Sequence, residues 1–507
     1  MRAGRARLVT LLLGVCLLLG AAVVWLLLRP GAPAAGTPAA GGAHGADPGR
    51  TGEIGARVAG TPGTYDSHPD ADVARLLLPN LRGREDTGTL IDSNAFGMRE
   101  RDWAVPKPDG TVRVVLLGDS YVFGMGVAAD QRCGVLLERM LKERAQVQPV
   151  PPIEVLHLGI TSWGLAAATE YMRRQLGLTR PDLVIEHIVP NDLDDTNGVR
   201  GFGSPGKLVP ARPQAGDAAI SLTYARWQLN PQAKPLLAWG LDGESRMRLQ
   251  DGAARLTRLR DDVTASGGRY LLLVNWHGYQ AVAARHLAPA VPEAEVAYLS
   301  KEFYRDARYR ISEADEHWNP AGHEQVAKVL YGLIATRGLL PQLQLAPDEE
   351  AAALARQMDA AGRADAQRPD GDPEQIARGF VGPAVTFPAP GADSAGQVYG
   401  GIDKDGFVAP YAALVLRRDG NSLHLTGRCL ARPELDGATL SVFVDELPLA
   451  RIAIAAGSSV DRTEPLPAEL RERPFVAVRL SCDDFVYDGP ELRHTICFQL
   501  QRVALEP

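Results

Sequence analysis

Residues 112–121 read VRVVLLGDSY. The β-branched, apolar run ends at Gly118, and a helical pattern begins near Gln131, so the stretch predicts a strand, a tight turn and a helix. Such a turn places the Ser120 hydroxyl at the carboxyl edge of a sheet, next to backbone N–H groups that can stabilise an oxyanion. Ser120 is therefore the candidate nucleophile, provided that a base lies downstream.

A candidate base follows near the end of the same segment. Residues 315–323 read DEHWNPAGH and precede a stretch with the apolar spacing of an amphipathic helix, which places His317 on a loop before that helix. A serine hydroxyl needs a proton acceptor near neutral pH, and that acceptor needs an anion that fixes its tautomer. We predict His317 as the general base and Asp315 as the carboxylate that orients it.

Asn191 is the candidate for a third role. The run LVIEHIV at residues 183–189 predicts a strand, and the residues after it read PND. Because parallel strands end at the same edge of a sheet, Asn191 is expected beside Ser120, where its side-chain amide can donate to an oxyanion. The alternative is a turn in which the Asn side chain merely ends the strand.

The order and spacing of these blocks resemble the SGNH (GDSL-type) hydrolase superfamily over roughly residues 65–340. Residues 115–124 look like its serine block, 189–192 like its asparagine block and 315–323 like its final Asp-His block. Residues 93–99, SNAFGMR, are similar to a lead-in found in membrane-tethered bacterial members. The resemblance implies an SGNH/flavodoxin-like α/β fold, a three-layer parallel sheet, with serine esterase activity and no cofactor.

The glycine block departs from the family pattern. Within residues 156–164, His157 replaces the family's Asn, and Ser162 stands where the second glycine is expected. A backbone N–H survives the change from Gly to Ser. The resemblance therefore implies three oxyanion donors, namely the backbone N–H groups of Ser120 and Ser162 and the side-chain amide of Asn191.

The carboxylate also departs from the pattern. Asp315 lies two residues before His317, whereas the family often has an Asp three residues before its His, where this chain has Ala314. Asp315 orients His317 if the loop presents the carboxylate to the ring nitrogen distal to Ser120. Otherwise the enzyme runs as a Ser-His dyad, and losing the orienting carboxylate can cost orders of magnitude in rate.

The N-terminal region predicts a membrane anchor. Residues 8–28 are uncharged and almost wholly apolar, long enough to span a bilayer, and three arginines precede them. This distribution predicts a cytoplasmic N-terminus and a periplasmic or otherwise extracytoplasmic body. The alternative is a cleaved signal peptide and a secreted protein, with the small residues at 32–34 as the cleavage site.

Composition and charge limit the classes of partner. The 507-residue chain has a net charge of −7 and no concentrated basic stripe, so nucleic acid is a poor partner. No His or Cys spacing is typical of a metal site. Five cysteines are too few for a disulfide framework, although Cys482 and Cys497 can pair in an oxidising compartment. No feature of the sequence indicates an oligomeric state.

The chain is longer than one core usually organises, and its composition divides it into five segments. We predict a transmembrane anchor (1–29), an Ala/Gly/Pro-rich linker (30–63), a catalytic α/β domain (64–345), a second linker (346–392) and a small β-sandwich (393–507). Alternating strands and helices in the catalytic domain predict a parallel sheet covered on both faces. The last segment consists of short β-type runs separated by turn residues.

Three functions fit these observations. The first is an extracytoplasmic serine esterase acting on ester groups, O-acetyl in particular, of a surface or secreted polysaccharide. The second is a polysaccharide O-acyltransferase, in which a sugar hydroxyl replaces water in resolving the same acyl-enzyme. The third is a non-catalytic binding protein that keeps the fold. The combination of Ser120, Asn191 and His317 argues against the third function, and the altered glycine block argues for it.

Overall fold

The computed structural model describes residues 65–507 with several gaps. The segments outside the description are 1–64, 68–72, 74, 87–88, 162, 190–191, 194–239, 276–282, 314, 368–372, 380, 388–397, 403–405, 432–436, 438, 446, 483–485, 489–493 and 497. The predicted anchor at residues 8–28 therefore lies outside the described residues. Among the helices that are described, none combines the length and apolar character needed to cross a bilayer.

Five parallel strands form the sheet that positions the candidate site. They are β5 (Val112–Gly118), β6 (Ile153–Gly159), β7 (Leu183–Ile188), β8 (Arg269–Val274) and β9 (Val296–Tyr298). Their spatial order is β6-β5-β7-β8-β9, and every neighbouring pair is parallel. In chain order this is 2-1-3-4-5, the flavodoxin-like arrangement, in which ligands bind where the order reverses. The predicted fold is confirmed, and the reversal falls between β5 and β7.

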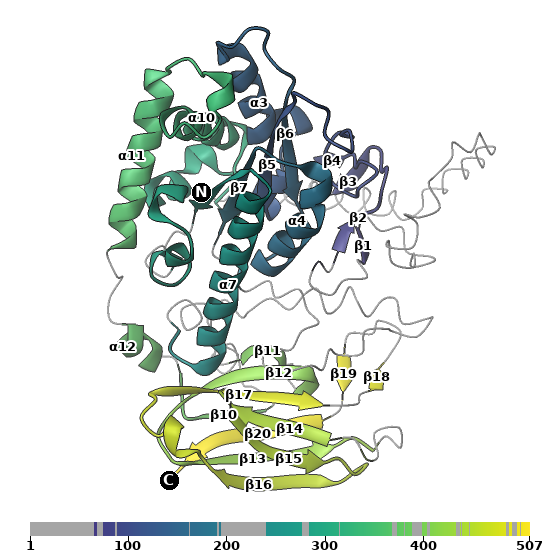
Figure 1. Ribbon diagram of the computed structural model, residues 1–507. Coiled ribbons are helices and arrows are strands. Elements are labelled where there is room, and N and C mark those ends of the chain that lie inside the picture. Colours follow the sequence, from purple (N-terminus) through teal and green to yellow (C-terminus); the bar gives the residue numbers. More distant parts are fainter. Residues whose placement is uncertain are drawn as a thin grey trace, which may run out of the picture. The chain divides into compact units, whose positions relative to one another are not determined.

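Helices cover both faces of this sheet (Figure 1). The longer ones are α3 (Cys133–Arg144), α4 (Leu165–Thr179), α7 (Gly243–Ala265), α10 (Pro320–Thr336) and α11 (Glu349–Ala366), and the shorter ones are α2 (Ser120–Phe123), α9 (Lys301–Arg305) and α12 (Pro373–Arg378). Side chains of α4 and α7 bury one face of the sheet, whereas those of α3, α10 and α11 bury the other. The α/β domain therefore has three layers.

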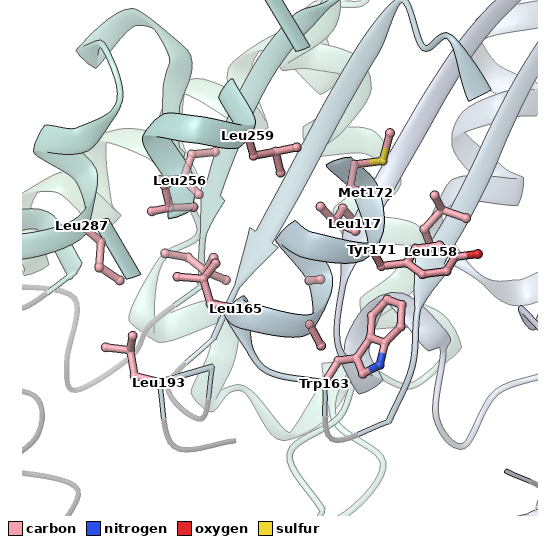
Figure 2. Packing of buried hydrophobic residues seen from close by; sticks show 14 of the residues in the cluster. Leu117, Leu158, Trp163, Leu165, Tyr171, Met172, Leu193, Leu256, Leu259 and Leu287 are labelled. Carbon is pink, nitrogen blue, oxygen red and sulfur yellow. The ribbon is translucent and has the colours of Figure 1, made fainter. Parts of the chain in front are cut away.

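The strands serve both cores because successive side chains point to opposite faces. Val115 and Leu117 of β5 belong to the core under α4 and α7, and Val114 and Leu116 belong to the core under α3 and α10. Figure 2 shows the first of these cores, with side chains of α4 and α7 packed among those of the strands. A strand buried on both faces reads as a continuous apolar run, which is the pattern of β5 in the sequence.

Helix α11 extends the α/β domain beyond the boundary expected from the sequence. It lies within residues 346–392, the predicted second linker, but it packs on α10 and β9. A Cβ added to Gly332 of α10 would lie 2.2 Å from the carbonyl oxygen of Ala351 in α11, so the two backbones approach closely. The alanine-rich composition that resembles a linker is here the composition that allows this close packing.

The C-terminal part is an antiparallel β structure, as predicted. Its strands are β10 (Ala384–Thr386), β11 (Val398–Ile402), β12 (Phe407–Arg417), β13 (Ser422–Cys429), β14 (Thr439–Val444), β15 (Leu447–Ala453), β16 (Ser459–Pro465), β17 (Phe475–Cys482) and β20 (Phe498–Glu506). The hydrogen-bonded order is β15-β14-β17-β12-β20-β13-β16. β12 joins β20 only at Phe407 and Val408 and then follows β17, so the path bends there. The inward side chains of both halves enclose one core.

Three short hairpins complete the described strands. They are β1 (Tyr65–Ser67) with β2 (Arg75–Leu77), β3 (Arg84–Asp86) with β4 (Thr89–Ile91), and β18 (Val486–Asp488) with β19 (His494–Ile496). Cys482 is buried at the end of β17. Its predicted partner Cys497 lies outside the described residues, so this disulfide stays a prediction.

Glu186 is a carboxyl group inside the sheet. It lies on β7, fully buried, and its Oε2 accepts a hydrogen bond from the hydroxyl of Tyr270 on β8, whereas its Oε1 has no partner among the described residues. Burial raises the pKa of Glu186 to about 8, and the hydrogen bond from Tyr270 opposes that rise only in part. The folded protein therefore holds this carboxyl group protonated at neutral pH.

We expect Glu186 to make the fold less stable as the pH rises. Between its usual pKa of 4.5 and about 8, the unfolded chain releases a proton that the folded chain keeps. The free energy of unfolding then falls by up to about 1.4 kcal/mol per pH unit through this group. Glu186→Gln is expected to remove this slope, as urea unfolding between pH 5 and pH 9 will show. Parallel pH profiles for the two proteins would contradict the assignment.

Candidate active site

Ser120 opens a single helical turn directly after β5. Asp119 caps this turn, α2, by accepting a hydrogen bond from the backbone N–H of Tyr121 at 3.0 Å. The turn ends at Gly124, whose φ of 76° favours glycine. Ser120 is the first residue of this helix, so its backbone N–H has no acceptor within the helix.

Two glycines allow α2 to sit tightly against the sheet. A Cβ on Gly159, at the end of β6, would lie 2.8 Å from the Asp119 carbonyl oxygen and 2.9 Å from the Phe123 nitrogen. A Cβ on Gly118 would lie 2.8 Å from a methyl group of Val122. Any side chain at either position would push the nucleophile turn away from the strands. The first glycine of the glycine block is thus explained by this close approach.

His317 and Asp315 meet Ser120 in one hydrogen-bonded line. The Ser120 hydroxyl lies 2.7 Å from His317 Nε2, and His317 Nδ1 lies 2.6 Å from Asp315 Oδ1. With Nδ1–H donated to the carboxylate, Nε2 is free to accept the serine proton. The serine hydroxyl also lies 3.3 Å from the Asp119 carboxylate, but the shorter contact is the one with His317. The structure thus brings together the three residues predicted for nucleophile, base and orienting group.

The spacing of two residues does not keep Asp315 from His317. The same Oδ1 of Asp315 also accepts the backbone N–H of His317 at 3.1 Å, which curls the loop so that the carboxylate faces Nδ1. Burial alone would raise the pKa of Asp315, but the hydrogen bonds from the His317 ring and backbone outweigh it, and the pKa lies below its usual range. Asp315 therefore carries its negative charge at neutral pH.

The residues after His317 fix the loop on which it lies. The Asn319 side chain caps α10 by accepting the Gly322 N–H at 3.0 Å, and it donates to the carbonyl oxygens of Arg308 and Arg310 at 2.9 Å each. A Cβ on Gly322 would lie 2.4 Å from the Tyr309 carbonyl oxygen. The segment before the loop is therefore held against the start of α10, with His317 between them.

His157, the residue that departs from the family pattern, connects three segments. Its Nε2 accepts the Gly134 N–H at the start of α3 at 3.1 Å, and its Nδ1 lies 2.7 Å from the carboxylate of Glu100. Burial and the nearby Arg132 charge lower the pKa of His157 to about 4. Burial would raise the pKa of Glu100, but the His157 hydrogen bond and Arg132 lower it to about 2. A neutral imidazole therefore bridges a helix start and a buried carboxylate.

Asn191 and Ser162 lie outside the described residues, and their oxyanion roles stay predictions. Hydrogen bonds connect the described residues on either side of them. The Asp192 side chain accepts the Val189 N–H at 2.6 Å, and the Asp192 carbonyl oxygen accepts the N–H of Leu165 at the start of α4 at 3.0 Å. The loop after β7 and the loop after β6 are therefore joined by a backbone hydrogen bond beside the nucleophile strand.

The described residues include no group of three or more His, Cys, Asp or Glu side chains arranged to hold a metal ion. Three residues that shape the site were not assigned a role from the sequence, namely Asp119, Tyr121 and Asn319. Asn319 followed by Pro320 has the sequence signature of a helix start, an Asn cap with Pro at the first helical position. Asp119 is likewise a residue type preferred at a helix cap, and its contact with Tyr121 is local. The contact of Tyr121 with Glu316, 195 residues away, depends on tertiary structure, so no local pattern indicates it.

No family model matches the chain, and no curated protein matches it. A Clostridium thermocellum family 3 carbohydrate esterase is 18% identical, with a TM-score of 0.29, over 46% of this chain and 99% of the other. A two-domain esterase described as active on acetylated mannans is 11% identical, with a TM-score of 0.28, over 78% and 92%. A putative lipolytic protein of the G-D-S-L family from Desulfitobacterium hafniense is 12% identical, with a TM-score of 0.25, over 44% and 99%. At such low identities and TM-scores, the functional assignment rests on the geometry of the site.

Proposed function

We propose that this chain is a serine ester hydrolase of SGNH type, with Ser120 as nucleophile, His317 as general base and Asp315 as the residue that orients His317. The observation that carries the proposal is the unbroken line of hydrogen bonds from Ser120 through His317 to Asp315, with contacts of 2.7 and 2.6 Å. This line lies next to the reversal point of a parallel sheet, where such folds bind ligands.

In the first half of the reaction, Ser120 Oγ attacks the ester carbonyl carbon while His317 Nε2 takes the hydroxyl proton. The carbonyl oxygen becomes an oxyanion, which the Ser120 N–H and the predicted donors Ser162 and Asn191 stabilise. The imidazolium that forms is stabilised by the Asp315 carboxylate. His317 then protonates the leaving alcohol, the ester C–O bond breaks, and the acyl group stays on Ser120.

In the second half, water attacks the acyl carbon of the Ser120 ester. His317 accepts one proton from the water and returns it to Ser120 Oγ as the acyl–serine bond breaks. The products are the free acid and the regenerated serine. If a sugar hydroxyl attacks in place of water, the same groups perform an acyl transfer and the product is a new ester.

The proposed substrate is an acylated, in particular acetylated, carbohydrate outside the cytoplasm. The predicted anchor at residues 8–28 and the arginines before it support an extracytoplasmic location for the site. A second, all-β part of the chain is compatible with a polymeric substrate that extends beyond the site. The chain is proposed to contact the membrane through its N-terminal segment and to need no cofactor.

Ester turnover by the full-length chain tests the proposed function. We expect hydrolysis of p-nitrophenyl acetate and covalent labelling by a serine-directed phosphonate, with both signals absent in Ser120→Ala. Turnover that persists in Ser120→Ala, or a wild-type chain that shows neither turnover nor labelling, would reject the proposal.

The same assay separates hydrolysis from transfer when an unacetylated polysaccharide is added. We expect released acetate to account for the ester consumed, because we propose water as the acceptor. Appearance of acetyl groups on the polysaccharide, with a matching loss of free acetate, would assign the chain as an acyltransferase instead. Both outcomes use Ser120, so Ser120→Ala is the common control.

A further inference from the structure

Tyr121 connects the nucleophile turn to the loop that carries the base. It follows Ser120 directly and is only 5% exposed. Its hydroxyl donates a hydrogen bond to the carbonyl oxygen of Glu316, the residue before His317, at 3.1 Å. Its ring centroid lies 4.8 Å from that of His317 and 4.9 Å from that of Trp318. One side chain on the nucleophile turn therefore contacts three successive residues of the base loop.

The Glu316 side chain is held from a second direction. Its Oε2 accepts a hydrogen bond from the Tyr304 hydroxyl at 2.5 Å, and its Oε1 lies 3.5 Å from a guanidinium nitrogen of Arg310. Burial raises the pKa of the Tyr121 and Tyr304 hydroxyls above their usual range, so both stay protonated donors. Tyr121 thus holds the backbone of Glu316, and Tyr304 holds its carboxylate.

These contacts matter because Glu316 directly precedes His317. The backbone oxygen that Tyr121 binds belongs to the peptide group that joins Glu316 to His317. A shift of that peptide moves the imidazole relative to Ser120, whose hydroxyl lies 2.7 Å from Nε2. Displacements of about 1 Å in such a geometry can lower a rate by about 100-fold. Asp315 fixes the tautomer of His317, but Asp315 lies on the same loop and moves with it.

We propose that Tyr121, Tyr304 and Glu316 form a clamp that sets the distance between Ser120 and His317, with Tyr121 and Tyr304 as positioning residues for the proton transfer. The clamp rests on the proposed function for its kinetic consequence but not for its geometry. It couples the serine block to the final block of the sequence across a separation of 195 residues.

Tyr121→Phe in the full-length chain tests the clamp, because phenylalanine keeps the ring contact with His317 and removes only the hydroxyl. We expect kcat for p-nitrophenyl acetate to fall about 10- to 100-fold with KM changed less than about twofold. Tyr304→Phe is expected to lower kcat by a smaller factor. In the double variant, kcat should fall by a smaller factor than the product of the two single-variant factors, since both residues act through Glu316.

Tyr171→Phe is the matched control. Tyr171 is a buried tyrosine of α4 in the core shown in Figure 2, with 3% exposure, and its ring packs on that of Trp163. We expect it to leave kcat unchanged. If Tyr121→Phe and Tyr171→Phe lower Tm and kcat alike, or if Tyr121→Phe keeps the wild-type kcat, the clamp is rejected.

A second readout does not depend on turnover. The downfield NMR signal of the His317 Nδ1 proton, followed with pH, reports the geometry of the imidazole. We expect Tyr121→Phe to shift or broaden this signal and Tyr171→Phe to leave it unchanged. A chain without esterase activity whose His317 signal still responds to Tyr121→Phe rejects the proposed function and supports the clamp. A signal identical to wild type in Tyr121→Phe overturns the clamp.

Discussion

Ser120→Ala is expected to lower kcat for ester hydrolysis by about four to six orders of magnitude, and His317→Ala by a similar factor. Alanine at 120 keeps the backbone N–H but removes the atom that forms the acyl-enzyme. Alanine at 317 removes the acceptor that lies 2.7 Å from that atom. Because Ser120 and His317 act as one catalytic unit, the double variant should have about the same kcat as either single variant. Initial rates with p-nitrophenyl acetate measure all three.

A serine remote from the site provides the matched control. Ser266 follows α7, and its hydroxyl donates to the Val263 carbonyl oxygen at 2.7 Å. It precedes β8, so it lies at the amino edge of the sheet, opposite to Ser120. Ser266→Ala should keep wild-type turnover. Losses in Ser120→Ala and His317→Ala that multiply in the double variant would show that the two residues act independently, contrary to the proposed mechanism.

Asp315→Asn is expected to lower kcat by about three to four orders of magnitude at neutral pH. An amide nitrogen facing His317 Nδ1 donates a hydrogen bond there, which moves the imidazole proton to Nε2. An Nε2 that carries the proton cannot accept one from Ser120. Asp315 is ionised at neutral pH in the wild type, because its pKa lies below the usual range. Activity as a function of pH, measured for both proteins, checks this prediction.

The control for Asp315→Asn is Glu313→Gln, which also neutralises a carboxylate in the same loop. Glu313 is exposed and lies two residues before Asp315. We expect Glu313→Gln to retain wild-type kcat, because its side chain points to solvent. If Asp315→Asn lost no more activity than Glu313→Gln, the site would operate as a Ser-His dyad.

Much of the fold was predictable because its elements depend on local pattern. The run before Ser120 is a nearly continuous apolar stretch, which predicts β5, and the alternation of strands and helices after it predicts the parallel sheet. Helix α10 follows from its apolar spacing. Helix α11 was assigned to a linker because its segment is rich in Ala, Asp and Pro, and its place as a layer of the domain depends on close packing against Gly332 of α10.

The sequence indicated three members of the candidate site but not how they are arranged. Residue type and order indicated Ser120, Asp315 and His317, since the chemistry of a weakly acidic hydroxyl requires them. A spacing of two residues between Asp315 and His317 left their contact open. The contact exists because one Asp315 oxygen accepts both the backbone and the ring N–H of His317.

By itself the sequence determined the strand and helix pattern, the candidate nucleophile and the candidate base, because these depend on residue type and on neighbours along the chain. Only the tertiary structure decided that Ser120 lies within hydrogen-bond distance of His317, 197 residues away, and that Tyr121 holds the loop of that base. It also decided that His157 bridges α3 and Glu100. Hydrogen bonds require distances of about 3 Å, and such distances between remote residues are fixed by the packing of the whole domain.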